Sequence, residues 1–459
     1  MLSNIQARDL QSVLHPYTPL HRLGEMQPLV IARAKGVMVT DTAGRDYIEG
    51  MSGLWCAGLG FGDEELIEAG VEAMRSLSYY HLFGGKGIES AIALSERLIE
   101  LAPMEVGRVF FASSGSEAND TQVKLQWYLN NARGRPEKKK ILSRIKSYHG
   151  VTLMAASLTG LPANHRDFDL PLDRVVHLSC PHHYRFADAG ESEEDFTARL
   201  AEELRATIER EGADTIAAMI AEPVMGAGGV IIPPKGYFEA IQPILAENDI
   251  ALIADEVITG FGRTGEVWGS TTVGMVPQAM SLAKQLTSAY APLSAVLVGP
   301  EDYALLEQQS QKIGTFGHGF TYGGHPVSCA IALKTIEIYE QRGIVERVRA
   351  LAPRFAGHMR RLADHPLVGE ARHIGLVGGL ELVASKASRK PFDPARTVGM
   401  RAALFAQDRG AIVRAIGDTL AICPPMVITE GELDELFRRI EGALDDAEAM
   451  VAKEGLREV

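Results

Sequence analysis

An aspartate and a lysine each follow a short apolar run, and together they could hold an aldehyde cofactor. Asp255 follows the run 250–254, and Lys284 follows the run 280–283. Such runs predict buried strands of a parallel sheet, and α/β proteins bind ligands at the carboxyl ends of those strands. A lysine amine condenses with an aldehyde, while an aspartate keeps a pyridine nitrogen protonated so that the ring accepts electrons. Taken singly, each residue is more simply a turn residue or a solvated charge.

A third group could bind a phosphate. Ser114, Gly115 and Ser116 lie between an expected strand at 108–112 and an expected helix at about 117–130. Small residues let the backbone approach an anion, and the first turn of a helix offers unpaired N–H groups. The stretch lacks the lysine of a nucleoside triphosphate loop. A plain helix cap is the simpler alternative.

Two further strand ends carry groups that suit a flat cofactor ring. Tyr148 and His149 follow an expected strand at 140–144, and Glu222 follows one at 216–221. An aromatic side chain at such a point can stack on a ring, although core packing is its commoner role. Glu222 adds a second acid near the same edge, unless it is only a capping residue.

The composition is that of an ordinary globular protein and excludes several classes. The chain has 459 residues, 46% hydrophobic and 23% charged, with a net charge of −13. This length suits two or three subdomains. No basic cluster is interleaved with aromatics, so no nucleic acid partner is expected, and no apolar run is long enough to cross a membrane.

The cysteines point to a reducing compartment. Four cysteines are scattered without a CxxC pair, which favours free thiols and a cytoplasmic location. The start of the chain lacks the apolar core of a signal peptide. The stretch 180–183, Cys-Pro-His-His, matches no standard zinc spacing, so no metal site is expected.

Strands and helices alternate through the middle of the chain, which predicts an α/β fold with a mainly parallel sheet. The first 28 residues are expected to be irregular because prolines interrupt them. A strand–turn–strand hairpin is expected at 37–49, and the pattern changes after 326 to a long helix and a smaller α+β region. The other expected helices are 64–76, 88–101, 191–211 and 237–248, and the other expected strands are 377–383 and 420–422.

In this order the motifs resemble those of the class III, fold-type I family of pyridoxal-phosphate aminotransferases. The resemblance runs from about residue 14 to 443 and rests on 114–119, 148–150, 222–223, 255–265, Lys284 and 320–326. It implies a large cofactor-binding domain at 61–325, with a mainly parallel sheet of seven-stranded type flanked by helices. A small α+β domain would follow at 326–459, and the N-terminal segment 1–60 would join it.

The resemblance also implies roles for single residues around pyridoxal 5′-phosphate. Lys284 would bind the cofactor through its amine, and Asp255 would pair with the pyridinium nitrogen. Tyr148 and Val257 would cover the two ring faces, and Glu222 would lie near the phenolic oxygen. The phosphate would be bound by Ser114, Gly115 and Ser116 and by Thr321 of a neighbouring subunit, while His149 would be a cofactor-binding residue without a defined role. A homodimer is therefore expected, and a tetramer stays open.

Three stretches resemble the pyruvate-using ω-aminotransferases of this family. Trp55 and Phe83 would form aromatic walls of the substrate pocket, and Ala227 would leave room beside the ring next to Tyr148. Arg414 would be a mobile arginine that binds a substrate carboxylate, swings away for an amine without one and contacts Glu222 in some states. The simpler alternatives are core packing for the two aromatics and a surface ion pair for the arginine.

The expected reaction is transfer of an amino group from a primary amine to pyruvate by a ping-pong mechanism. The donor would be an amine, a diamine or an ω-amino acid, and the products would be an aldehyde or ketone and L-alanine. Lys284 would act as the catalytic base, supported by Asp255 and Glu222. A 4-aminobutyrate/2-oxoglutarate aminotransferase and a glutamate-semialdehyde-type aminomutase are the alternatives. A non-catalytic binding protein is the outsider, since it would be expected to lose Lys284 or Asp255.

Overall fold

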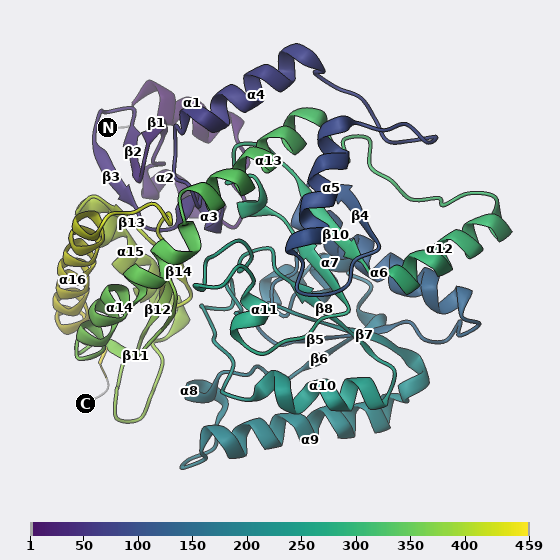
Figure 1. Ribbon diagram of the computed structural model, residues 1–459. Coiled ribbons are helices and arrows are strands. Elements are labelled where there is room, and N and C mark those ends of the chain that lie inside the picture. The colour runs from purple at the N-terminus through teal and green to yellow at the C-terminus, as the bar shows by residue number, and fades with distance from the viewer. Residues whose placement is uncertain (1–2, 458–459) are drawn as a thin grey trace.

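A seven-stranded sheet lies at the centre of the structure, a computed structural model that describes residues 3–457 (Figure 1). Its strand order is β4-β10-β9-β8-β7-β5-β6. The bounds are β4 (Arg108–Ala112), β5 (Lys140–Arg144), β6 (Val175–Leu178), β7 (Ile216–Ala221), β8 (Ala251–Asp255), β9 (Ala279–Leu282) and β10 (Ser294–Val298). All neighbouring pairs from β9 to β6 are parallel, and β10 runs antiparallel to β4 and β9. The predicted mainly parallel α/β fold is confirmed.

Helices cover this sheet, which is why its inner strands are apolar along their whole length. Every residue of β7 and β10 is buried. α6 packs on β4, β7, β9 and β10, and α10 packs on β8 and α9. The helices of this part are α6 (Gly115–Ala132), α7 (Leu153–Leu158), α8 (His183–Phe186), α9 (Glu193–Glu211), α10 (Tyr237–Glu247), α11 (Gly269–Thr272) and α12 (Pro300–Ile313).

Two four-stranded sheets lie to one side of the central sheet (Figure 1). One has the order β1-β2-β3-β13 and the other β11-β12-β15-β14. The bounds are β1 (Ile31–Lys35), β2 (Met38–Asp41), β3 (Asp46–Glu49), β11 (Val368–Ile374), β12 (Val377–Leu382), β13 (Ala411–Ile412), β14 (Arg414–Ile416) and β15 (Thr419–Ile422). The parallel pair β3–β13 joins the N-terminal segment to the C-terminal part of the chain. The domain limits 1–60, 61–325 and 326–459 stay a prediction.

The remaining helices pack largely on one another. α13 packs against α4, α5 and α14, and α16 packs against α14 and α15. Their bounds are α3 (Ser52–Trp55), α4 (Glu64–Ser76), α5 (Glu89–Leu101), α13 (Pro326–Gln341), α14 (Ile344–Ala363), α15 (Val398–Asp408) and α16 (Glu430–Lys453).

The prediction of an irregular N-terminus is wrong. The chain forms α1 (Asn4–Ser12) and α2 (Leu23–Met26) there. Ser3 and Gln6 form a capping box at the start of α1, and the prolines stand beyond its end, so they do not interrupt it. The expected helix at 117–130 likewise begins earlier, at Gly115, because the Ser114 hydroxyl caps it by accepting from the Glu117 amide at 3.2 Å.

All four cysteines are free thiols. Cys180, Cys329 and Cys423 are buried, and Cys56 is partly exposed. Within residues 3–457, no helix combines the length and the apolar character needed to cross a membrane.

The contact between α14 and α16 gives a test of core packing. Phe437 is fully buried, meets Phe355 edge-on at 5.1 Å and stacks on His358 at 4.6 Å. We expect Phe437→Ala to lower the free energy of unfolding by about 3–5 kcal/mol, since it removes buried area and leaves a cavity. Urea unfolding followed by circular dichroism measures this, with Ile313→Ala at an exposed position as the control. Equal midpoints for the two variants would contradict this packing.

Candidate functional site

A cavity of about 140 Å³ lies at the carboxyl ends of β5, β7, β8 and β9, beside the first turn of α6. It brings together eight of the residues that the sequence singled out. The lining comprises Gly115, Ser116, Asn119, Tyr148, His149, Gly150, Glu222, Asp255, Val257, Ile258 and Lys284. Ser114 stands directly before this lining as the cap of α6.

Asp255 is a buried carboxylate held by three donors. Its Oδ2 accepts from Asn119 Nδ2 and from His149 Nδ1, both at 2.8 Å. Its Oδ1 accepts from the Val257 amide at 3.2 Å. Several N–H donors favour the charged form of a carboxyl group, so this network suits a fixed negative charge inside the fold.

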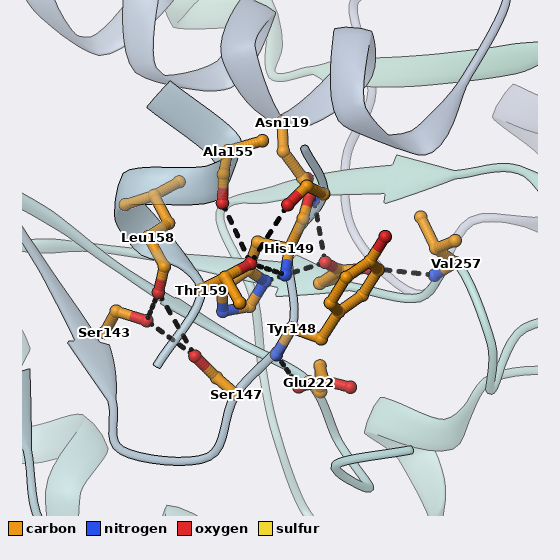
Figure 2. A network of polar contacts seen from close by, with 12 residues as sticks. Asn119, Ser143, Ser147, Tyr148, His149, Ala155, Leu158, Thr159, Glu222 and Val257 are labelled. Carbon is orange, nitrogen blue, oxygen red and sulfur yellow. Dashed lines mark hydrogen bonds and ion pairs between the residues drawn. The ribbon is translucent and has the colours of Figure 1, made fainter. Parts of the chain in front are cut away.

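His149 is buried and is itself held at several atoms (Figure 2). Because a carboxylate only accepts, Nδ1 of His149 carries the proton that it donates to Asp255. The His149 amide donates to Thr159 Oγ1 at 2.9 Å, and its carbonyl accepts from Asn119 Nδ2 at 2.7 Å. Its Nε2 is buried without a hydrogen-bond partner in the described part of the chain. His149 and Asn119 therefore orient Asp255.

Lys284 follows β9 by two residues and has a left-handed backbone conformation with φ of +49°. Burial lowers the pKa of its ammonium below the usual value, while Asp255 and Cys56 act in the opposite direction. A lysine with a lowered pKa is more readily neutral, which is the form that acts as a nucleophile or base.

Glu222 is also buried, and its carboxylate is held by backbone amides. Oε1 accepts from the Tyr148 amide at 2.9 Å, and Oε2 accepts from the Gly226 amide at 3.0 Å. The Glu222 carbonyl accepts from Arg144 Nη2 at 2.6 Å. Burial raises the pKa of Glu222 above its usual value. The carboxylate contacts these amides in this structure, with no contact to Arg414 among the bonds of the described residues.

Two glycines let the segments beside the first turn of α6 pack closely. A Cβ on Gly115 would meet Val257 Cγ1 at 3.1 Å, and one on Gly150 would lie 2.4 Å from Ser116 Oγ. Gly150 also has φ of +133°, which L side chains rarely adopt. The first amides of a helix have no acceptor within the helix, so they are available to a phosphate at this point.

A larger cavity of about 980 Å³ is linked to the first by a contact between two tyrosine rings. Tyr148 lines the small cavity and meets Tyr17, which lines the large one, edge-on at 6.4 Å. Arg414 lines the large cavity, and no group in the described part of the chain accepts a hydrogen bond from its guanidinium. Burial lowers the pKa of Arg414, while Tyr148 and Tyr17 act in the opposite direction.

Other predicted site residues do not line the small cavity. Trp55 is buried in an apolar cluster with Ile258, and Ala227 is buried in the loop after Glu222. Phe83 and Thr321 are exposed, and the Thr321 carbonyl accepts from the Tyr79 hydroxyl at 2.8 Å. Phe83 lines a separate cavity of about 590 Å³ beside residues 315–320.

Sequence reasoning missed two contributors. Asn119 stands four residues after Gly115, so helical spacing places both on one face of α6, and this signal could have found it. Tyr17 comes from the N-terminal region that was expected to be irregular, and no local pattern indicates its contact with Tyr148.

His182 lies in a separate acidic cluster with Glu370 and Glu381. His182 Nε2 lies 2.8 Å from Glu370 Oε2. Arg372 Nη1 donates to Glu370 at 2.6 Å and to Glu381 at 2.7 Å, and Arg185 Nε donates to Glu381 at 2.5 Å. The two guanidinium groups already neutralise both carboxylates, so the cluster is an ion-pair network that joins β11 to β12.

The small cavity fits a phosphate-bearing aldehyde with a basic ring nitrogen. Lys284 offers the amine, Asp255 offers a fixed negative charge, and the first turn of α6 offers amides for a phosphate. Tyr148 and Val257 supply an aromatic and an apolar surface in the same lining.

Comparisons with known proteins agree with this geometry. The sequence model of the family "Aminotransferase class-III" matches residues 21–444. The chain is 45% identical to gamma aminobutyrate transaminase 3, chloroplastic, of Solanum lycopersicum, over 98% of this chain and 88% of that protein. It is 46% identical to gamma-aminobutyrate transaminase 1, mitochondrial, of Oryza sativa subsp. japonica, over 96% of this chain and 86% of that protein.

Solved structures show the same likeness. An omega transaminase from Pseudomonas jessenii in complex with PMP has a TM-score of 0.96 and 49% identity, covering 98% of this chain and 99% of that one. A PMP-bound aminotransferase from Vibrio fluvialis has a TM-score of 0.95 and 47% identity, with the same coverage. This chain therefore belongs to the class-III aminotransferases, enzymes that use pyridoxal 5′-phosphate.

Proposed function

We propose that the protein is an ω-aminotransferase that moves an amino group from a primary amine to pyruvate. The observation that carries this proposal is Arg414, whose guanidinium lines the large cavity without a hydrogen-bond acceptor in the described residues. A carboxylate of a keto acid would pair with it. The wall around it is largely apolar, with Met51, Leu54 and Met400 among its residues, and this suits an amine without a carboxylate.

Pyridoxal 5′-phosphate, when bound, supplies an electron-accepting ring that makes the proton on the amine-bearing carbon acidic. Lys284 Nζ would hold the cofactor and would move that proton, because burial favours its neutral form. Asp255 would pair with the protonated ring nitrogen, and Asn119 and His149 keep its carboxylate in place. Glu222, held by the amides of Tyr148 and Gly226, stands as a second acid of the lining.

The other residues of the site would bind and orient the cofactor. The amides of Gly115 and Ser116, with the cap Ser114, would bind the phosphate. Tyr148 and Val257, both in the lining, would cover the two ring faces. Trp55 belongs to the same apolar cluster as Ile258, a residue of the small cavity, and would support the substrate side of the ring. Ala227, in the loop after Glu222, has a short side chain that would leave space beside the ring.

A similar enzyme that was engineered for amine synthesis supports an amine donor. One omega transaminase with 48% identity was changed at a tryptophan, a phenylalanine and an arginine for synthesis of bulky amines. Trp55, Phe83 and Arg414 are the same three residue types in the candidate substrate region of this chain. The curated relatives are named gamma-aminobutyrate transaminases, which favours 4-aminobutyrate as a second candidate donor. Its carboxylate would also pair with Arg414.

Two exposed residues support a site completed by a second copy of the chain. Thr321 and Phe83 lie at the surface, away from the small cavity of their own chain. Tyr79 and Tyr80 are exposed beside them, and exposed aromatic groups of this kind mark protein interfaces. In a homodimer, Thr321 would bind the phosphate in the partner's site and Phe83 would line its substrate pocket.

The choice of donor and acceptor is tested by separate half-reactions. The yellow protein is mixed with single donors: an arylalkyl amine, putrescine, β-alanine, 4-aminobutyrate and glutamate. We expect plain amines or putrescine to bleach the yellow absorbance and pyruvate to restore it. The reason is that Arg414 would bind the carboxylate of the acceptor, whereas the donor would not require one. Bleaching by glutamate alone, with recovery by 2-oxoglutarate and none by pyruvate, would contradict the proposal.

Replacement of Arg414 tests whether it binds the carboxylate of pyruvate and is dispensable for an amine donor. We expect Arg414→Leu to raise KM for pyruvate roughly 10- to 100-fold, since a hydrogen bond between charged groups contributes about 1.5–3 kcal/mol. The half-reaction rate with an arylalkyl amine should stay near that of the wild type, because this donor carries no carboxylate. Steady-state and half-reaction kinetics measure both, with Arg205→Leu on the exposed face of α9 as the control. Equal losses for both substrates would show that Arg414 does not bind the carboxylate.

A further inference from the structure

Glu49 is a buried acid that the proposed reaction does not use. It ends β3, and only 3% of its surface is exposed. Its Oε1 accepts from the Met51 amide at 2.8 Å, and its Oε2 accepts from the Gly53 amide. No lysine or arginine pairs with this carboxylate among the ion pairs of residues 3–457. A buried carboxylate that binds only backbone amides two and four residues ahead acts on that segment.

The segment that Glu49 holds is strained. Ser52, Gly53 and Trp55 all have positive φ, at 50°, 65° and 67°. Two of these three are L residues, for which a left-handed conformation is costly and persists only when surrounding contacts enforce it. The two amides bonded to Glu49 flank Ser52, so the carboxylate is one of the contacts that enforce this shape.

Other contacts fix the far side of the same turn. Ser52 Oγ donates to the Cys423 carbonyl at 2.7 Å and accepts from Arg263 Nη2 at 3.1 Å. The Trp55 amide donates to the Met51 carbonyl at 2.9 Å. The turn is thus held at Ser52 by Cys423 and Arg263, and at its Met51 and Gly53 amides by Glu49.

This segment forms part of the wall of the large cavity. Met51, Gly53 and Leu54 line the large cavity that also holds Arg414. Met51 and Trp55 belong to the same apolar cluster as Ile258, which lines the small cavity with Lys284. A change in the shape of residues 51–55 therefore changes the space beside Arg414 in the large cavity.

The carboxyl group of Glu49 changes charge in the neutral range. Burial raises its pKa to about 7, and the two amide donors act in the opposite direction. The ionisable groups that face it are the Cys56 thiol from the segment itself and the Cys423 thiol after β15. Arg263 reaches the segment at Ser52, and burial raises the pKa of both thiols, so both stay neutral.

We propose that Glu49 is a positioning residue for donor selection, whose carboxylate holds residues 51–55 as one wall of the substrate cavity and loosens its hold on taking up a proton. This rests on the proposed function of the large cavity. The sign follows from the bonds: a carboxylate accepts at both oxygens, whereas a protonated carboxyl has one oxygen that donates and accepts poorly. The wall is held above pH 7 and loosens below it.

Hydrogen–deuterium exchange of the holoenzyme tests the contact without any turnover. We expect Glu49→Gln to speed exchange of the Met51 and Gly53 amides about 10-fold, because one amide then faces the NH₂ group of glutamine. The control is Glu209→Gln on the exposed face of α9, where no partner is lost among the described residues. In the wild type, exchange at residues 50–57 should rise between pH 8 and pH 6 after correction for intrinsic rates. Exchange at 50–57 that matches Glu209→Gln, or that rises equally along the whole chain, overturns the proposal.

The preference for one donor over another distinguishes the proposed role of Glu49 from a purely structural one, which would leave this preference unchanged. We expect the ratio of kcat/KM for an arylalkyl amine to that for alanine to fall about 10-fold in Glu49→Gln, mainly through KM, and to recover in part in Glu49→Asp. In the wild type this ratio should rise with pH through about 7, and in Glu49→Gln it should be flat. An unchanged ratio overturns the proposal even if exchange is faster. If Glu49→Gln does not fold, the pH series of the wild type decides.

The two proposals fail in different ways. If no plain amine bleaches the wild-type protein, the proposed function fails, while the exchange experiment still reads the bonds of Glu49. The selectivity ratio is then measured with 4-aminobutyrate and alanine, the pair of donors that the alternative function allows. Faster exchange with an unchanged ratio would overturn the proposal for Glu49 and leave the proposed function standing.

Discussion

A buried negative charge organises the site. Asp255 stands at the end of a buried strand, where an ionised carboxylate is costly unless donors surround it. Asn119, His149 and Val257 provide those donors, from α6, from the loop after β5 and from the chain just beyond β8. These three segments must therefore meet at one point. β8 and β9 are parallel neighbours, with Asp255 opposite Ser281, so Lys284 is brought to the same edge three residues later.

A second network ties the cavity to the smaller sheets. Arg372 on β11 donates from Nε to the carbonyls of Gly229 and Val230 at 3.0 Å, and it is paired with Glu370 and Glu381. The loop that contains these carbonyls begins at Glu222, whose carboxylate is held by the Gly226 amide. Movement of β11 and β12 would therefore be transmitted to this loop. This explains the position of the cluster around His182 without a metal ion.

The sequence was sufficient for the strands that carry the site because buried parallel strands are continuous apolar runs. β4, β5 and β7 begin and end at the predicted residues, and the residues predicted at their ends, with Asp255 and Lys284, meet in one cavity. The capping box of α1, the pairing of β3 with β13 and the contact of Tyr17 with Tyr148 depend on distant or overlooked partners. Periodicity contains no signal for such long-range contacts, and Glu49 shows the same limit, since only the folded segment reveals what its carboxylate holds.

The proposed chemistry requires Lys284 as the amine that binds the cofactor. The most direct measurement is to reduce the yellow protein with borohydride, digest it and locate the modified lysine by mass spectrometry. We expect the added mass of the reduced cofactor to lie on Lys284 and to be absent from that peptide in Lys284→Ala. A modified lysine elsewhere, with Lys284 unmodified, would contradict it.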